Sequence, residues 1–351
     1  MTLSTAERTP VGPSGVRPAS RRRRLVAGLV LGLLVLVAGS ALSLIFGSRV
    51  VSWDEIIGGI TAPDPASFAE QAVATRIPRT VLALVVGAAL GISGALMQGI
   101  TRNPLADPGL LGVNLGAALA VVLGITLFSI STSGQYVWFA LAGATAAALI
   151  VYAVGSIGRG GATPLRLAIA GAATSAALSS LVSAVLLLRT DVFDTFRFWQ
   201  VGGVGGASFA QMTPVVPFLV VGLILAVIAI PGLDVLALGD EVARGLGGSV
   251  GRSRLIAGAA AVLLAAASTA IAGPIAFVGL VVPHAARLFT GPGHRWLLPY
   301  SAVFGSALLL VADVIGRVIS RPADIPVGIM SAIIGAPFFI WLIRRSKVRE
   351  L

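Results

Sequence analysis

The sequence contains no cysteine and only one lysine, Lys347, among its 351 residues. Without cysteine the chain forms no disulfide bonds, thiolate metal sites or cysteine nucleophiles. A phosphate-binding loop of the GxxxxGK[ST] type needs a lysine followed by serine or threonine, and Lys347 is followed by valine. The chain therefore has no ATP site of this kind.

Histidine is nearly as scarce, with His284 and His294 alone. Neither lies at metal-ligand spacing from another candidate ligand, and no serine, histidine and aspartate occur in the context of a hydrolytic triad. We expect His284 to be a packing or interfacial residue. The sequence therefore predicts no enzyme, no metal site and no cofactor bound by this chain.

Charged residues make up only 11% of the chain, while 56% of its residues are hydrophobic. A soluble domain needs about 25% charged residues to cover its surface, so part of this surface must face lipid. Disorder needs low hydrophobicity, which restricts it to the polar N-terminal tail. The net charge of +11 suggests nucleic-acid binding at first, but the positions of the charges favour a membrane-orientation signal instead.

Ten apolar segments of roughly 16–24 residues follow one another, a length that suits membrane-spanning helices, whereas barrel strands have about 9–11 residues. Turns rich in glycine, proline and asparagine separate them. We therefore predict an all-α, polytopic membrane protein with about ten transmembrane helices. The segments lie near 25–46, 78–98, 112–130, 136–157, 165–188, 211–231, 254–273, 275–290, 298–315 and 325–343.

The polar N-terminal segment ends in Arg21–Arg24, directly before the first apolar segment. That segment is longer than the ~7–15 residues of a secretory signal core and can cross ~30 Å of hydrocarbon. We interpret it as an uncleaved first span, with signal cleavage as the alternative. We expect a basic, disordered cytoplasmic tail at 1–24, a transmembrane domain at 25–343 and a cytoplasmic tail at 344–351.

Basic residues indicate the orientation of these spans. With the N-terminus inside, 18 of the 25 arginines and lysines lie on the inner side, as the positive-inside rule requires. Both termini are then cytoplasmic, and the high positive charge needs no nucleic-acid partner. The seven basic residues left on the outer side are Arg49, Arg76, Arg79, Arg189, Arg197, Arg317 and Arg321.

The interiors of the spans are nearly free of charge. An ion-coupled carrier usually has acids or paired charges within its spans. The nearest candidate is Asp313, close to the outer end of the ninth span, and Arg317 is a partner for it at i,i+4. The chain therefore shows no convincing energy source of its own, although an ion-coupled secondary transporter remains the alternative.

A compact polar segment, LGDEVARGLGGSVGRSR at 238–254, interrupts the apolar sequence on the inner side. The acids Asp240 and Glu241 favour the start of a short helix, and the glycines from Gly245 onward favour its end. The segment is either a solvated loop between two spans or a docking surface for a partner that supplies energy.

This segment resembles the coupling loop of the FecCD-type permeases, the membrane subunits of type II ABC importers for iron–siderophore complexes, haem and cobalamin. Four further blocks resemble the same family, and together they extend from about Leu25 to Ile343. The blocks are RIPRTVLALVVGAALGISGALMQ at 76–98, NPLADPGLLGVNLGAA at 103–118, GPIAFVGLVVPHAARL at 273–288 and ADVIGRVISRPADIPVGIMSAIIGAPFFIWLI at 312–343.

The resemblance implies the permease subunit of a binding-protein-dependent importer in the bacterial inner membrane. Two permease subunits, either two copies or a mixed pair, would line one path for the intact chelate. Two cytoplasmic ATPase subunits would bind ATP and magnesium, and an extracytoplasmic lipoprotein or periplasmic protein would deliver the substrate. Ferric siderophore is the leading substrate, with cobalamin and haem as alternatives.

The resemblance also implies roles for individual residues. The coupling loop, about 234–252, would contact the ATPase through Leu238, Gly239, Asp240, Glu241, Ala243, Arg244, Leu246 and Gly247. Arg76, Arg79 and Arg317 would meet carboxylates of the binding protein in exposed pairs, each worth only ~0–1 kcal/mol, or anchor helix ends by snorkelling. Independently of the resemblance, the irregular Gly/Asn/Pro segment at 99–116 predicts a gate beside the path, because non-helical backbone near membrane depth is tolerated where it lines a cavity. Its candidate residues, which could equally cap helix ends, are Gln98, Asn103, Pro104 and Asn114.

Overall fold

The computed structural model describes residues 18–47, 51–61, 67–157 and 163–345, and this part of the chain is helical with no strand. Each of the ten expected spans coincides with one apolar helix, which confirms the all-α membrane fold. These helices are α1 (Pro18–Ile45), α3 (Phe68–Thr101), α4 (Val113–Phe128), α5 (Ser133–Ser156), α6 (Pro164–Leu188), α9 (Val216–Leu236), α11 (Val250–Ala272), α12 (Val278–Thr290), α13 (His294–Ile319) and α14 (Val327–Arg345).

Seven of the described helices are long and apolar enough to cross a membrane, and three more are apolar but shorter. The shorter helices are the expected spans α4, α12 and α14. Six short elements connect or cover the long ones. They are α2 (Trp53–Thr61), η1 (Pro108–Leu111), α7 (Thr190–Gln200), α8 (Phe209–Met212), η2 (Thr213–Val215) and α10 (Asp240–Gly245).

The helices extend further than the expected region boundaries. Helix α1 begins at Pro18, so Arg21–Arg24 belong to the helix rather than to a preceding tail. Helix α14 continues to Arg345, and the segment between α9 and α11 shortens to residues 237–249. The expected tails at 1–17 and 346–351 lie outside the described residues.

Helix α3 forms the centre of the bundle, where it packs against α11, α12 and α13. Its apolar window is 78% buried, compared with 6% for that of α1 at the periphery. Glycine permits this close packing: a Cβ on Gly87 would collide with the backbone of Gly305, and one on Gly94 with that of Gly279. In lipid, such small residues let helix backbones approach because packing drives the association.

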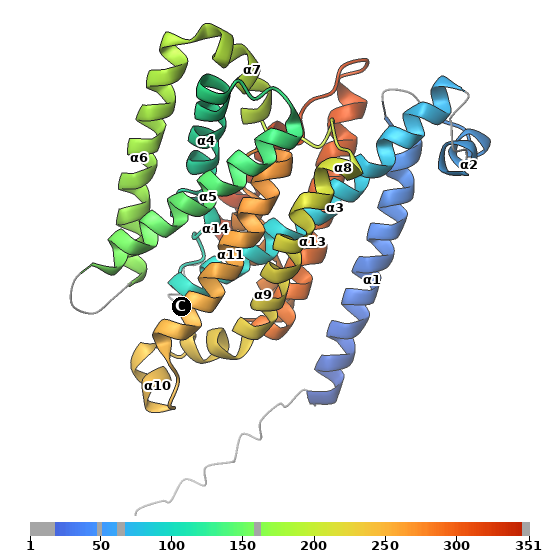
Figure 1. Ribbon diagram of the computed structural model, residues 1–351. Helices are drawn as coiled ribbons and strands as arrows, with labels where there is room; N and C mark the ends of the chain where they lie inside the picture. The colour runs from blue at the N-terminus through green and yellow to red at the C-terminus, as the bar shows by residue number, and fades with distance from the viewer. Residues whose placement is uncertain (1–17, 48–50, 62–66, 158–162, 346–351) are drawn as a thin grey trace, which may run out of the picture.

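Figure 1 shows the two ends of the bundle. The end that holds α10 and the start of α1 is called here the α10 end. The opposite end, which holds α2 and α7, is called the α7 end.

Candidate functional site

A buried charged cluster at the α7 end joins three helices. Asp313 on α13 is fully buried, and its Oδ1 lies 2.8 Å from Nη2 of Arg79 on α3. Its Oδ2 lies 2.9 Å from Nη2 of Arg317, one turn further along α13. The i,i+4 pairing expected from the sequence is thus confirmed. Arg79 also reaches Asp324, with 2.6 Å between Nη1 and Oδ2.

The same cluster fastens the end of α1. Arg317 donates to the carbonyl oxygens of Ser43 and Phe46, both at 3.1 Å, and to Oγ of Ser43 at 2.6 Å. Arg76 donates to the carbonyl oxygen of Leu44 at 2.7 Å. The last carbonyls of a helix lack partners within it, and a cation there also meets the negative end of the helix dipole.

The expectation that these three arginines are exposed is wrong. Arg76, Arg79 and Arg317 are 5%, 9% and 2% exposed, and each donates hydrogen bonds within the chain. Their partners lie on segments far away in the sequence, so only the Asp313–Arg317 pair was visible from spacing.

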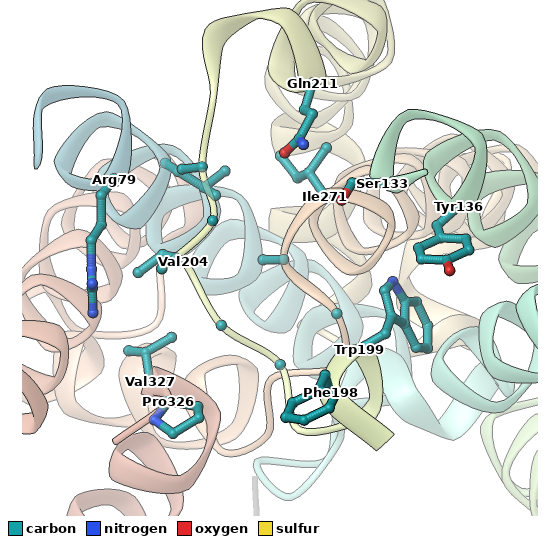
Figure 2. A pocket seen from close by; sticks show the side chains of 18 of the residues that line it. Arg79, Ser133, Tyr136, Phe198, Trp199, Val204, Gln211, Ile271, Pro326 and Val327 are labelled. Atoms are coloured by element: carbon teal, nitrogen blue, oxygen red, sulfur yellow. The ribbon is translucent and has the colours of Figure 1, made fainter. Parts of the chain in front are cut away.

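A cavity of about 270 Å³ opens beside this cluster, around the glycine-rich segment 202–207 (Figure 2). Arg79 lies on one side, while Tyr136 of α5 and the aromatic pair Phe198 and Trp199 of α7 lie on the other. This site was not predicted from the sequence. Its signal was the run FRFWQVGGVGGAS at 196–208, in which two glycine pairs follow an aromatic helix end.

At the α10 end, the polar segment singled out in the sequence contains the expected short helix, α10. The helix follows Gly239, whose φ is +106°, and is followed by Gly247, whose φ is +80°. Asp240 forms ion pairs with Arg102 at 2.8 Å and with Arg254 at 2.9 Å. Because Arg102 caps the end of α3 and Arg254 lies on α11, Asp240 ties α10 to two long helices.

The remaining coupling candidates divide into two groups. Ala243, within α10, is buried. Leu238 and Leu246 flank α10 and are 61% and 66% exposed. Val242, which was not among the candidates, lies within α10 and is 50% exposed. Glu241, Arg244 and Gly247 are also exposed, so α10 presents a mixed apolar and charged surface away from the bundle.

A contact between His294 and Asp234, which the sequence did not reveal, lies nearby. The Nδ1 atom and the backbone N–H of His294 both lie 2.8 Å from Oδ1 of Asp234. The contact joins the end of α9, just before α10, to the start of α13. Among the described residues, no three metal-ligating side chains come together.

Of the four path candidates, Gln98 and Asn114 bond to other helices, and Asn103 and Pro104 lie in the turn after α3. Gln98 is buried; its Oε1 accepts from Arg287 of α12 at 2.7 Å, and its Nε2 donates to the carbonyl of Leu280 at 3.1 Å. Asn114 accepts from Thr269 of α11 at 3.0 Å. Asn103 accepts from the N–H of Leu105 at 2.9 Å, just after α3, and Pro104 is half-buried beside it. These bonds join helices and stabilise the turn after α3.

Asp107 lies in the same connecting segment, between α3 and η1. Its Oδ1 accepts from the N–H of Gly109 at 2.7 Å and so caps η1. Burial raises the pKa of this carboxyl group, and the Gly109 bond only partly opposes the rise. The sequence analysis placed this residue in an irregular segment but gave it no role.

Comparison with known proteins decides the family. The model of the FecCD transport family matches residues 34–345. The chain belongs to the FecCD transport family. FepD, the ferric enterobactin transport system permease protein of Escherichia coli, is 44% identical over 315 residues, which cover 90% of this chain and 94% of FepD. YfiZ of Bacillus subtilis, described as a probable siderophore transport system permease protein, is 38% identical over 318 residues, or 91% of this chain and 96% of YfiZ.

A solved structure agrees with this assignment to the FecCD family. A metal-chelate type ABC transporter, in an inward-facing conformation, superposes with a TM-score of 0.78 at 29% identity, over 92% of this chain and 99% of that one. The resemblance inferred from the coupling segment and four further blocks is therefore confirmed. The chain is a multi-pass membrane protein of a transport family, not of an enzyme family.

Proposed function

We propose that this FecCD-family chain is the permease subunit of a binding-protein-dependent ABC importer for ferric siderophores. It would span the bacterial plasma membrane with both termini in the cytoplasm and pass the intact chelate along a path between two permease subunits. The similarity to FepD over nearly the whole of both chains is the observation that carries this proposal. Relatives named for iron–citrate and iron–hydroxamate import support the same class of substrate.

The α10 surface is the proposed contact with the ATPase subunit. Leu238, Val242 and Leu246 offer apolar area to a groove on a partner, and the exposed Glu241 and Arg244 offer charge beside it. Asp240 would hold this surface at a fixed position relative to α3 and α11 through its two ion pairs. ATP-driven closure of the ATPase pair would then move these helices together with α10.

The charged cluster at the α7 end is the proposed docking region for the substrate-binding protein. Asp324 is the accessible member, with its side chain 38% exposed, and it bonds to one edge of Arg79. A carboxylate of the arriving protein would replace Asp324 on Arg79, because the planar guanidinium fork can donate to either carboxylate. Arg76 and Arg317 would keep the end of α1 and Asp313 in place around Arg79 during this exchange.

A path lined by the irregular segment after α3 completes the proposal. Gln98, Asn103, Pro104 and Asn114 lie at or near this segment, and non-helical backbone at membrane depth is tolerated where it is buried or lines a cavity. The chelate would supply the ligands of the iron, so the permease would need neither cysteine nor clustered histidine.

Purification from native membranes followed by reconstitution tests the function. The tagged chain should bring with it an ABC ATPase, and mass spectrometry should show whether the second permease is a copy or a related chain. In proteoliposomes, uptake of radioactive ferric enterobactin should require ATP and the binding protein. Uptake driven by a proton gradient without ATP would overturn the proposal in favour of a secondary transporter, and uptake of cobalamin or haem alone would overturn the substrate class.

A further inference from the structure

The cavity around residues 202–207 has a lining that neither coupling to the ATPase nor docking explains. Its lining comes from α3, α5, α7, α8, α11 and α14 together with the segment 202–207, and Figure 2 shows these elements around it. Its volume of about 270 Å³ lies just below the ~300–1,000 Å³ of ordinary ligand pockets. It can therefore hold one arm of a large ligand rather than the whole of it.

The lining contains a hydrogen-bond donor without a partner. The Nε1 of Trp199 is shielded from solvent and has no partner among the described residues. Figure 2 shows the nitrogen-bearing edge of Trp199 turned toward the side formed by Ser133 and Tyr136. A buried donor without an acceptor is unfavourable, so a ligand oxygen placed there would satisfy it.

The glycine-rich segment adds backbone donors. Gly203 donates to the carbonyl of Ala272 at 2.7 Å, and Ala207 donates to that of Val204 at 3.3 Å. Between them, the N–H groups of Val204, Gly205 and Gly206 donate to no other residue in the described part of the chain. An amide N–H group that lacks an acceptor favours a ligand oxygen within its reach.

Aromatic faces make up the opposite wall. Tyr136, Phe198 and Trp199 all line the cavity. The buried ring of Phe196 lies 5.6 Å from that of Trp199 and supports it from behind. Flat aromatic surfaces of this kind favour offset or edge-to-face contact with another ring.

The segment that carries these groups is held in place. Gly202 has φ of +70°, and its carbonyl accepts from the N–H of Gly328 at the start of α14 at 3.1 Å. A Cβ on Gly202 would collide with the carbonyl oxygen of Pro274. The cavity is thus built on fixed backbone contacts with α11 and α14, and is not a gap beside a loose loop.

The charges at the rim also favour oxygen-rich groups. A Cβ built on Gly205 would lie 3.7 Å from Nη1 of Arg79. The cluster contains the three guanidinium groups of Arg76, Arg79 and Arg317 against the carboxylates of Asp313 and Asp324, and both carboxylates are already paired. Asp324 is the carboxylate that lines the cavity, and its Oδ2 lies 2.6 Å from Nη1 of Arg79.

We propose that this cavity is an entry subsite that receives one planar, aromatic, oxygen-bearing arm of the ferric chelate. The ring of the arm stacks against the Phe198 and Trp199 wall, and its oxygens accept from the Trp199 indole and the 204–206 amides. This inference rests on the proposed import function. It adds the substrate subclass: an aromatic chelate such as ferric enterobactin rather than a non-aromatic one such as ferric citrate.

Equilibrium binding tests the subsite directly. The full-length chain in proteoliposomes, without binding protein, is incubated with radioactive ferric enterobactin or ferric citrate. Trp199→Phe keeps an aromatic ring but removes the N–H donor, so the dissociation constant for ferric enterobactin should rise about fivefold to tenfold, the effect of one hydrogen bond. The matched control is Trp138→Phe on α5, an exposed tryptophan outside the cavity, which should bind like the original chain.

Three outcomes would overturn the subsite. They are no detectable binding of ferric enterobactin, equal binding by the Trp199→Phe variant, and equal affinity for ferric citrate. A fourth would assign the cavity to a side chain of the binding protein: Trp199→Phe would weaken stimulation of the ATPase while chelate binding stays unchanged. The ATP-dependent uptake assay distinguishes failure of the subsite from failure of the import function. If the original complex takes up ferric chelate but any of these four outcomes is observed, only the subsite is wrong.

Discussion

Asp313 bridges Arg79 and Arg317, with one carboxylate oxygen 2.8 Å from the first guanidinium and the other 2.9 Å from the second. The carboxylate is fully buried, and the arginine side chains are 10% and 3% exposed. One acid thereby neutralises charge from two helices, and through Arg317 it also holds the end of α1. Burying such a group is favourable only while its partners stay in place.

Asp313→Asn should destabilise the protein strongly. It leaves two buried guanidinium groups with one fewer anionic partner, and breaking a buried pair typically costs about 3–5 kcal/mol. Thermal unfolding in detergent should show a clear fall in melting temperature. The control is Asp194→Asn on α7, whose pair with Arg197 is exposed and 3.4 Å long. An equal effect of both substitutions would contradict the bridging role.

Asp324→Asn should strengthen docking of the binding protein. Asp324 occupies the edge of Arg79 that an incoming carboxylate would use, so loss of its charge lets the incoming carboxylate compete better for that edge while Asp313 still holds the other. The concentration of binding protein that half-stimulates ATP hydrolysis should fall severalfold, and the basal rate should not change. Arg79→Gln should have the opposite effect. Unchanged stimulation in both variants would remove Arg79 from the docking surface.

Asp240→Asn should loosen coupling without detaching the ATPase. The substitution weakens both contacts that tie α10 to Arg102 and Arg254, but leaves the exposed apolar surface of α10 intact. The complex should still co-purify and hydrolyse ATP, while the chelate transported per ATP hydrolysed should fall severalfold. Asp240→Glu, which keeps the charge, should restore part of the ratio. Loss of the ATPase on purification would instead make Asp240 part of the contact surface.

Asp107→Asn should stabilise the protein in a pH-dependent way. Burial raises the folded-state pKa of Asp107 above its unfolded value of about 3.9. At pH values above the unfolded pKa, folding therefore loses free energy, because the unfolded chain ionises this carboxyl group more readily than the folded chain does. Below the unfolded pKa the carboxyl group is protonated in both states, and the effect disappears. The variant should unfold at a higher temperature than the original at pH 7, and at a similar temperature at pH 4. The Asn side chain still offers an oxygen to the N–H of Gly109.

Much of the fold could be predicted from the sequence because lipid imposes a simple rule. A segment that crosses hydrocarbon must be long, apolar and internally hydrogen-bonded, so all ten long helices were visible as apolar segments. The short helix α10 was also visible, since acids and glycines mark its ends. Helix ends were less certain: α1 continues N-terminally to Pro18 because arginines are good helix formers.

The sites were harder to predict because their residues meet across the bundle. Arg79 and Asp324 are separated by 245 positions, and Arg102 and Asp240 by 138. No local pattern reports such contacts, whereas the Asp313–Arg317 pair on one helix face followed from spacing alone. The cavity near Trp199 was missed for a related reason. Its donors are backbone N–H groups, and a sequence does not show which of these lack partners.

The position of α3 between the two charged clusters relates this protein to the thickness of its membrane. From Arg79 to Arg102 the helix contains no proline, so it rises about 35 Å over these residues at ~1.5 Å each, slightly more than the ~30 Å hydrocarbon core of a typical bilayer. Arginines bonded to Asp313 at one end and to Asp240 at the other hold this length fixed. A thinner bilayer is therefore met by tilting of α3 or by local thickening of the bilayer, and acyl-chain length becomes a variable that acts on both clusters at once.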